Sequence, residues 1–155
     1  MPIEMNELFG IAGKVAVITG ANSGVGEATA LAFAKEGATV VISARRIEPL
    51  NAVADKIKAE GGTVLAVPTD ISDKAACENL MDKAVEAFGK IDILVNNAGI
   101  TRDGLLMGMK EEDFDSVINV NLKGTFNTIR FASRTMVKQR KGKIINISSV
   151  SGVTG

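Results

Sequence analysis

A glycine-rich turn near the start of the chain has the chemistry of a phosphate-binding site. The segment Thr19–Gly26 reads TGANSGVG and directly follows the apolar run Val15–Ile18. Glycine lets a backbone approach a ligand closely, and the helix predicted after the turn offers free N–H groups and partial positive charge to a phosphate. A dinucleotide pyrophosphate fits these properties, although glycines alone are also typical of an ordinary tight turn. The turn residues expected to contact the dinucleotide are Gly20, Asn22, Ser23, Gly24, Val25 and Gly26.

The end of the second predicted strand, residues 39–43, indicates which dinucleotide binds. In dinucleotide-binding folds an acidic side chain at this point accepts hydrogen bonds from the ribose 2′-hydroxyl and repels a 2′-phosphate. Here the chain has Ala44-Arg45-Arg46 instead. Because guanidinium groups bind phosphate oxygens bidentately, we expect NADP in preference to NAD, with Arg45 as the phosphate contact and Arg46 beside it. The alternative is that both arginines are solvated residues at the start of the next helix.

Polar side chains also follow two later predicted strands. Residues 91–95 lead into Asn96-Asn97-Ala98-Gly99, and residues 143–147 lead into a serine-rich segment that includes Ser149. Two adjacent amides are costly to bury, because each needs several hydrogen-bond partners, so we expect neither to be a simple core residue. A serine at the carboxyl end of a parallel strand lies where doubly wound folds bind ligands. An ordinary serine-rich turn is the alternative.

Alternating apolar and amphipathic segments supply the framework for these residues. Continuous apolar runs are typical of parallel strands covered on both faces, and helical periodicity with glycine stops predicts helices between them. The pattern indicates one α/β domain over residues 1–155, a three-layer Rossmann-like doubly wound parallel sheet of order 3-2-1-4-5, truncated after strand five. The expected strands are 14–19, 39–43, 63–67, 91–95 and 143–147, and the expected helices are 27–36, 49–60, 72–88 and 111–140.

Composition argues against several classes of function. The 18 basic residues balance 18 acidic ones, so no overall charge attracts nucleic acid or an anionic membrane. The chain has one cysteine and no histidine, so we expect neither an internal disulfide nor a metal site. No apolar run approaches the roughly 20 residues of a membrane span, and residues 1–12 lack the basic start of a signal peptide. We therefore expect a soluble cytoplasmic protein.

Two spaced motifs resemble those of the short-chain dehydrogenase/reductase family. They are T-G-x-x-x-G-x-G at the glycine turn and N-N-A-G at residues 96–99. The continuation I-T-R-D-G-L-L at residues 100–106 resembles the bacterial 3-oxoacyl-[acyl-carrier-protein] reductases in particular. The resemblance covers essentially all 155 residues, but only the N-terminal part of a typical family member. It implies reduction of a 3-oxoacyl thioester carbonyl, in fatty acid biosynthesis, by hydride transfer from a nicotinamide cofactor.

The resemblance also implies roles in cofactor binding for residues after the third and fourth strands. Asp70 would accept a hydrogen bond from the adenine amino group, and Ile71 would pack beside the ring. Asn97 would tie neighbouring strands together, while Ala98 and Gly99 let the cofactor approach. An additional or alternative role for Asp70 is to help start the next helix.

The resemblance implies catalytic roles for two further polar residues. Asn121 is the expected catalytic asparagine inside the long predicted helix, with Asn119 as the alternative, and asparagine is disfavoured by propensity at such a position. Ser149 is the expected catalytic serine, which would hydrogen-bond the substrate carbonyl or hydroxyl. In the glycine turn, Ser23 departs from the pattern of NADP-preferring family members, because many of them carry a basic residue at that position.

The general acid of the family is missing from this sequence. The resemblance predicts a tyrosine and a lysine downstream of Ser149, but the chain ends at Gly155 and contains no Tyr and no His. Three interpretations compete: a truncated or partly given reductase chain, a non-catalytic NADP-binding module, and a structural half-fold fragment. We favour the first because Asn121 and Ser149 are retained, and we expect the chain alone to be inactive.

Two kinds of partner are predicted besides the cofactor. The basic residues of segment 138–143 are a candidate contact for an acidic acyl carrier protein, although a solvated helix end is the favoured explanation for them. A fifth strand left as an open edge, beside an uncovered apolar helix face, predicts a homo-oligomer or association with the missing C-terminal part.

Overall fold

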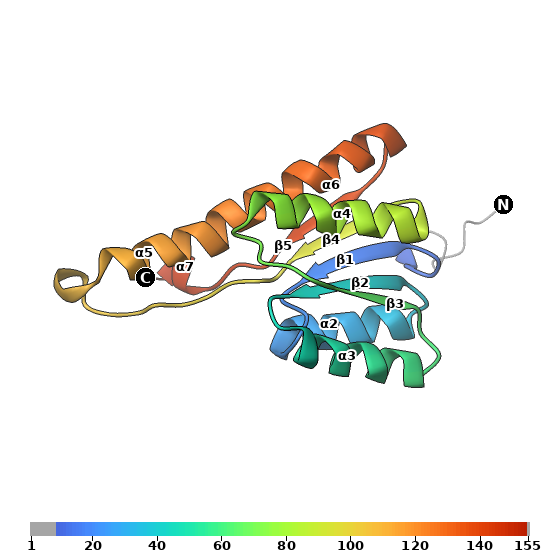
Figure 1. Cartoon of the computed structure of the whole chain (residues 1–155), viewed down its shortest axis with the longest axis horizontal. Coiled ribbons are helices and arrows are strands. Elements are labelled where there is room, and N and C mark those ends of the chain that lie inside the picture. Colours follow the sequence, from blue (N-terminus) through green and yellow to red (C-terminus); the bar gives the residue numbers. More distant parts are fainter. Residues whose placement is uncertain (1–8, 155) are drawn as a thin grey trace.

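The apolar runs of the sequence form a five-stranded sheet in the computed structural model, which describes residues 9–154. Every strand pair is parallel, and the order β3-β2-β1-β4-β5 is the predicted one (Figure 1). The central strand β1 is buried along its whole length, as expected for a strand covered on both faces. The strands are β1 (Val15–Thr19), β2 (Thr39–Ala44), β3 (Val64–Pro68), β4 (Ile93–Asn96) and β5 (Lys143–Asn146).

Helices cover both faces of the sheet, with α2 and α3 on one side and α4 and α6 on the other (Figure 1). The predicted glycine stops are present, since Gly37 and Gly89 have φ of +84° and +77° just after α2 and α4. The helices are α2 (Gly24–Lys35), α3 (Ile47–Ala59), α4 (Lys74–Phe88), α5 (Glu111–Val117), α6 (Thr125–Gln139) and α7 (Ser151–Thr154), with the 3-10 turn η1 (Leu106–Gly108) and the π-helical segment η2 (Ile118–Gly124).

The sheet divides the apolar core into two layers. In β1, Val15 and Val17 pack into the layer that contains the buried residues of α4 and α6. Ala16 and Ile18 pack into the layer that contains the buried residues of α2 and α3. This alternation follows from the two-residue period of a strand, and it explains why β1 has no polar face.

Asp92 joins the starts of β1 and β4. Its carboxylate accepts a hydrogen bond from the Val15 N–H at 2.8 Å and lies 3.0 Å from the Lys90 ammonium. Partial burial disfavours the charged form, but the Val15 hydrogen bond and Lys90 outweigh it, so the pKa of Asp92 lies below its ordinary value of 3.8. The ionised carboxylate therefore stabilises the folded chain.

The predicted long helix is present, but it is not uniform. α5, η2 and α6 follow one another without a break, and the middle segment has π-helical hydrogen bonding. Such segments are rare and occur frequently at functional sites. The predicted apolar face points to solvent, since Phe114, Leu122 and Phe126 are 56%, 64% and 58% exposed. The residues of α6 that are buried are Asn127, Thr128, Phe131, Ala132 and Met136.

The strand β5 is the predicted open edge of the sheet. All of its residues are exposed, and within residues 9–154 its one neighbour in the sheet is β4. Its apolar residues Ile144 and Ile145 are 38% and 42% exposed. A strand with free N–H and C=O groups and apolar side chains can pair with further chain, which is consistent with the predicted association.

Candidate cofactor site

A cavity of about 620 Å³ lies at the carboxyl ends of the strands. A doubly wound sheet binds ligands here, because the connections after β1 and β4 turn to opposite faces and leave a crevice between them. The predicted cofactor residues that line the cavity are Gly20, Asn22, Ser23, Arg45, Arg46, Asp70, Ile71, Asn97, Ala98 and Gly99. The other lining residues are Ser43, Ala44, Thr69, Ile100 and Val120.

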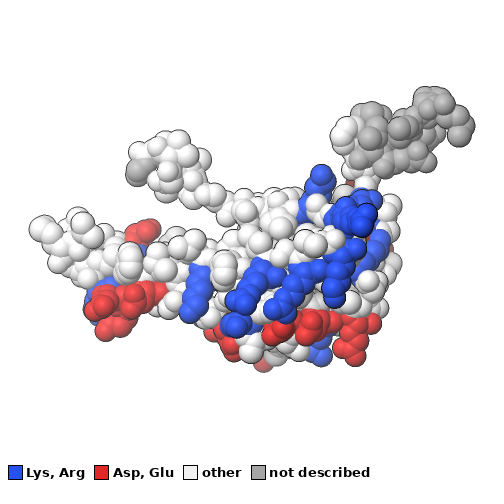
Figure 2. All heavy atoms as spheres, turned by 90° about the horizontal axis from the view of Figure 1, so that it is seen from above, with Lys and Arg blue, Asp and Glu red and all other residues white. Residues whose placement is uncertain are grey.

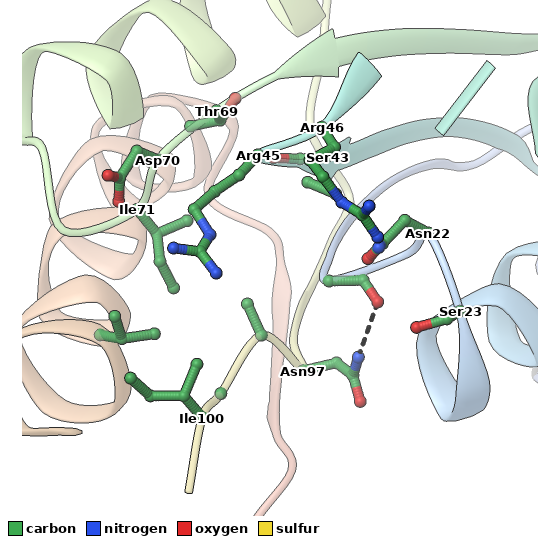
Figure 3. A pocket seen from close by; sticks show the side chains of 15 residues that line it. Asn22, Ser23, Ser43, Arg45, Arg46, Thr69, Asp70, Ile71, Asn97 and Ile100 are labelled. Atoms are coloured by element: carbon green, nitrogen blue, oxygen red, sulfur yellow. Dashed lines mark hydrogen bonds between the residues drawn. The ribbon is translucent and has the colours of Figure 1, made fainter. Parts of the chain in front are cut away.

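Thr19 and Asn97 join the glycine turn to the end of β4. The Thr19 hydroxyl oxygen accepts hydrogen bonds from the N–H groups of Asn97 and Ala98 at 3.1 and 3.0 Å. The side-chain amide of Asn97 donates to the carbonyl oxygens of Thr19 and Gly20, both at 3.2 Å. Figure 3 draws one of these bonds. Asn97 thus bridges two neighbouring strands, which is the contact pattern that the sequence implied for it.

Glycine is required where the glycine turn meets the end of β4. Gly20 has a φ of +64°, and a Cβ there would lie 2.8 Å from the Cα of Ala98. A Cβ on Gly26 would collide with the Gly20 carbonyl oxygen and lie 2.6 Å from Asn97 Nδ2. Gly24 has a φ of +55°, and no atom lies within 4 Å of its Cβ position, so it leaves open space at the start of α2. The predicted residues Gly24, Val25 and Gly26 do not line the cavity itself.

Arg45 and Arg46 extend into different parts of the cavity (Figure 3). Arg45 extends toward Ile71, whereas Arg46 extends toward Asn22 of the glycine turn. Both arginines are exposed, and neither takes part in an ion pair within residues 9–154. Because β2 ends in Ala44 rather than a carboxylate, the guanidinium groups give this side of the cavity a positive potential.

Asp70 and Ile71 form another wall of the cavity. The Asp70 carboxylate accepts hydrogen bonds from the Ser72 N–H at 3.0 Å and the Ser72 hydroxyl at 2.6 Å, so it does help to start the next helix. Asp70 is nevertheless exposed, and one carboxylate oxygen makes no hydrogen bond within the described part of the chain. Ile71 is buried against Gly124 of η2, whose Cβ would lie 2.7 Å from Ile71 Cδ1.

The single cysteine lies beneath this wall. The Cys77 thiol is fully buried and donates a hydrogen bond to the Ile71 carbonyl oxygen at 3.2 Å. Burial, together with the nearby charges of Asp73 and Asp70, raises the pKa of Cys77 to about 12. The thiol is therefore protonated at neutral pH, and Cys77 acts as a core residue.

Asn121 lies in η2, next to the cavity. Its side-chain oxygen accepts from the Ile100 N–H at 2.8 Å, and its side-chain nitrogen donates to the Ile100 carbonyl at 2.9 Å. The main-chain carbonyl of Asn121 accepts from the Thr125 hydroxyl at 2.8 Å. Ile100 and Val120 line the cavity, whereas Asn121 supports that wall from behind. The alternative candidate, Asn119, lies in the same segment, and both asparagines are exposed.

Ser149 lies outside the cavity on the exposed segment after β5. Its hydroxyl accepts a hydrogen bond from the Ser151 N–H at 3.2 Å and lies 3.2 Å from the Ser151 hydroxyl. These contacts lie at the start of the short helix α7. The structure therefore does not bring Ser149 into one cavity with the predicted cofactor residues.

The two amides after β4 have different roles, which corrects the expectation that neither belongs to the core. Asn96 is buried, and its side-chain nitrogen donates to Asn146 Oδ1 at 2.9 Å. Its side-chain oxygen accepts from the Thr128 hydroxyl at 2.6 Å. Burial is possible because β5 and α6 supply both partners, and the sequence alone gave no sign of this pairing.

Within positions 9–154, no group of His, Cys, Asp and Glu side chains could hold a metal ion. In the same part of the chain, no helix combines the length and the apolar character that a membrane span requires.

The comparison with known protein families decides the classification. Residues 14–155 match the family model described as short chain dehydrogenase. The chain belongs to the short-chain dehydrogenase family. A 3-oxoacyl-[acyl-carrier-protein] reductase of Thermotoga maritima is 49% identical over 143 residues, which cover 92% of this chain and 58% of that protein. A (2S)-[(R)-hydroxy(phenyl)methyl]succinyl-CoA dehydrogenase subunit of Thauera aromatica is 46% identical, covering 95% of this chain and 59% of that protein.

Solved structures of other short-chain dehydrogenases have the same fold. One from Mycobacterium marinum has a TM-score of 0.93 at 38% identity and covers 97% of this chain, which spans 62% of that protein. One from Burkholderia phymatum, in complex with NAD, has a TM-score of 0.92 at 38% identity. The match covers 95% of this chain and 53% of that protein. This short-chain dehydrogenase chain thus spans less than two thirds of the length of each of these four relatives. Family members bind a nicotinamide cofactor.

The cavity of this chain fits the adenosine side of such a cofactor. The glycine turn leaves open space at the N-terminus of α2, where a phosphate is favoured. The side chain of Ser43 borders the cavity, and its hydroxyl is buried without a hydrogen-bond partner in the described part of the chain. A donor left unpaired beside a polar cavity is chemically suited to a ligand rich in acceptors. Sequence reasoning missed Ser43, because a serine inside an apolar strand gives no sign of which way it faces.

Proposed function

We propose that the chain supplies the cofactor site of an NADP-dependent reductase that acts on the carbonyl of a 3-oxoacyl thioester. The observation that carries the cofactor assignment is the pair Arg45 and Arg46 in the cavity, beside a strand that ends in Ala44. Guanidinium groups bind a 2′-phosphate, and no carboxylate at this strand end repels it. The substrate class is supported by the similarity to the Thermotoga maritima reductase and by the segment I-T-R-D-G-L-L.

NAD is the alternative cofactor. It occupies the relative from Burkholderia phymatum, and Ser23 of this chain adds no positive charge to the turn. NADP is favoured because NAD would leave both guanidinium groups without an anionic partner. Its ribose 2′-hydroxyl would also find no carboxylate acceptor at the end of β2.

The residues of the chain would have binding and positioning roles. The bound cofactor supplies a hydride for the substrate carbonyl. Asn97 and the glycine turn would hold the dinucleotide, Asn121 would fix the Ile100 wall, and Ser149 would hydrogen-bond the substrate oxygen. The 155 residues contain no Tyr and no His, so we propose that the proton for that oxygen comes from a group outside them.

Calorimetric titration with NADPH and NADH tests the cofactor assignment. We expect the chain to bind NADPH about tenfold or more tightly than NADH, and Arg45→Ala to remove most of that difference, because a charged phosphate contact is lost. Arg130→Ala is the matched control, since Arg130 is an exposed arginine on α6 outside the cavity. Equal affinities for the two cofactors, or an unchanged preference in Arg45→Ala, would contradict the assignment.

Turnover separates a reductase from a non-catalytic NADP-binding module. We expect negligible reduction of an acetoacetyl thioester by the 155-residue chain, because the usual general acid is absent. A chimera would append the part of the Thermotoga maritima relative that lies beyond the aligned region. Restored turnover that depends on Ser149 supports the reductase, whereas a folded, cofactor-binding chimera without turnover supports the module.

We also propose that the chain self-associates through its uncovered apolar surface. This surface combines the exposed side chains Phe114, Leu122 and Phe126 of the long helix with the open edge β5. Exposed apolar patches of this kind mark interaction surfaces. Size-exclusion chromatography with light scattering is expected to show a dimer or larger species, and a stable monomer at high concentration would contradict it.

An acyl carrier protein is the proposed macromolecular partner. Figure 2 shows Lys and Arg side chains gathered in a band on the side of the molecule that carries α4 and α6. Lys138, Arg140, Lys141 and Lys143 are exposed. Attraction between such residues and an acidic protein weakens as salt screens the charges. We expect the affinity for acyl carrier protein to fall as the ionic strength rises. The double variant Lys138→Glu, Lys141→Glu should lose the binding. An affinity that does not depend on salt would contradict the role of these residues.

A further inference from the structure

Ser43 presents an unexplained buried hydroxyl at the wall of the cavity. The residue lines the cavity, none of its surface is exposed, and its Oγ has no hydrogen-bond partner within the described residues. A buried hydroxyl without a partner destabilises a fold, and nearly all buried polar groups in native proteins are paired. A role in binding would explain why a serine is present here despite this loss of stability.

The main chain fixes the direction in which Ser43 points. Its carbonyl oxygen accepts the Ala21 N–H at 3.1 Å, so the residue is anchored to the glycine turn. Side chains alternate along a strand, and the next residue, Ala44, packs into the layer of α2 and α3. Ser43 therefore faces the layer of α4 and α6. On that side the cavity is lined by Ile71 and Ala98, which also pack against this layer.

Two hydroxyls close to Ser43 in the fold, those of Thr19 and Thr69, are already engaged in hydrogen bonds. Thr19, the register partner of Ser43 in β1, accepts the N–H groups of Asn97 and Ala98. The Thr69 hydroxyl donates to the Val67 carbonyl oxygen at 3.1 Å. Of these three hydroxyls, the one on Ser43 alone makes no hydrogen bond within the described residues.

We propose that the Ser43 hydroxyl donates a hydrogen bond to the adenosine half of the bound dinucleotide. The inference rests on the cofactor site proposed above and adds a residue that neither motif nor charge pattern identified. Ser43 lines the same cavity as Arg45, which is expected at the 2′-phosphate, and as Asp70 and Ile71, which are expected at the adenine. Adenine nitrogens and ribose oxygens are suitable acceptors. The bond forms only in the complex, so the hydroxyl raises affinity without stabilising the free chain.

Calorimetric titration of the full 155-residue chain with NADP⁺ and with 2′,5′-ADP, which carries only the adenosine end, tests this contact. In Ser43→Ala we expect both ligands to bind about fivefold more weakly, the effect of one net hydrogen bond. We expect the melting temperature of the free variant to be unchanged or higher, because no protein hydrogen bond is lost. Thr128→Val is the matched control: its buried hydroxyl already donates to Asn96, so its melting temperature should fall while both affinities stay unchanged.

The outcomes are distinguishable. If the wild-type chain binds both ligands and Ser43→Ala binds them with the same affinities, the proposed contact is overturned and the proposed cofactor site stands. A loss confined to NADP⁺, with 2′,5′-ADP unaffected, overturns the assignment to adenosine. A weaker affinity accompanied by a fall in melting temperature like that of Thr128→Val shows a structural role instead. A wild-type chain that binds neither ligand refutes the proposed cofactor site and this contact together.

Discussion

The side chain of Asn121 pairs with the main chain of Ile100 as a neighbouring strand would. Asn121 Oδ1 accepts the Ile100 N–H at 2.8 Å, and Asn121 Nδ2 donates to the Ile100 carbonyl at 2.9 Å. Gly99, beside this pair, is so close that a Cβ on it would lie 3.4 Å from Asn121 Oδ1. The cavity wall formed by the loop after β4 thus depends on one amide from the π-helical segment.

Replacement of Asn121 by alanine should loosen this wall. Asn121→Ala leaves the N–H and C=O of Ile100 without their partners, so we expect the free energy of unfolding to fall by about 1–2 kcal/mol. Hydrogen exchange at the Ile100 amide should accelerate. Chemical denaturation and hydrogen exchange with mass spectrometry measure the two effects. Asn119→Ala, two residues earlier on the exposed surface, should change neither, and equal behaviour of the two variants would contradict the assigned role.

Gly26 should be intolerant of any side chain. In Gly26→Ala the new Cβ collides with the Gly20 carbonyl oxygen and approaches Asn97 Nδ2, and a main-chain atom cannot move aside cheaply. We expect a loss of about 3 kcal/mol in the free energy of unfolding. Gly104→Ala is the control, because no atom lies within 4 Å of its Cβ position, and its effect should stay within about 0.5 kcal/mol. A fully stable Gly26→Ala chain would refute this packing.

Asp92 should make stability depend on acid. Because its pKa is lowered in the folded chain, its stabilising contribution is complete above the ordinary value of 3.8 and is lost as the pH falls through the folded value. At pH 7, Asp92→Asn should lower the free energy of unfolding by about 1–2 kcal/mol, because the charge paired with Lys90 is gone. Below pH 3.8 the difference from wild type should shrink.

Denaturation curves across pH check the Asp92 prediction. Asp55→Asn serves as control, since Asp55 is exposed on α3 and takes part in no ion pair within residues 9–154. Its effect should be small at every pH. If the difference in free energy of unfolding between Asp92→Asn and wild type stays constant from pH 7 to strong acid, the carboxylate charge is not the cause of that difference.

Cys77 should be unreactive until the chain unfolds. With a pKa raised to about 12, only roughly one thiol in ten thousand is ionised at pH 8, and the sulfur is fully buried. A disulfide reagent such as Ellman's should therefore label the native chain negligibly at pH 8 and label it completely in denaturant. Rapid labelling of the native chain would mean that the α4 layer opens.

Much of the fold was predictable from local patterns. The strands appear within about two residues of their predicted bounds, because continuous apolar runs between glycine stops specify buried parallel strands. The order 3-2-1-4-5 follows from right-handed crossovers between parallel strands. The glycine turn and the N-N-A-G segment were recognisable because the backbone approach at Gly20 and Gly26 tolerates no other residue.

The tertiary structure decided what depends on contacts between distant residues. Sequence alone favoured Asn121 over Asn119 but could not show that the side chain of Asn121 bonds the main chain of Ile100. Sequence also treated Asn96 like Asn97, whereas partners on β5 and α6 allow Asn96 to be buried. The sequence predicted an uncovered apolar face on the long helix, and the structure shows that Phe114 and Phe126 belong to it.

The sequence by itself determined the strands, the helices and the main-chain geometry of a dinucleotide turn, because propensity, periodicity and glycine requirements act over a few residues. Only the tertiary structure decided the directions of Arg45 and Arg46, the unpaired state of the Ser43 hydroxyl and the position of Ser149 outside the cavity. These properties depend on which atoms from other elements come within hydrogen-bond distance, and that is set by packing across the sheet rather than along the chain.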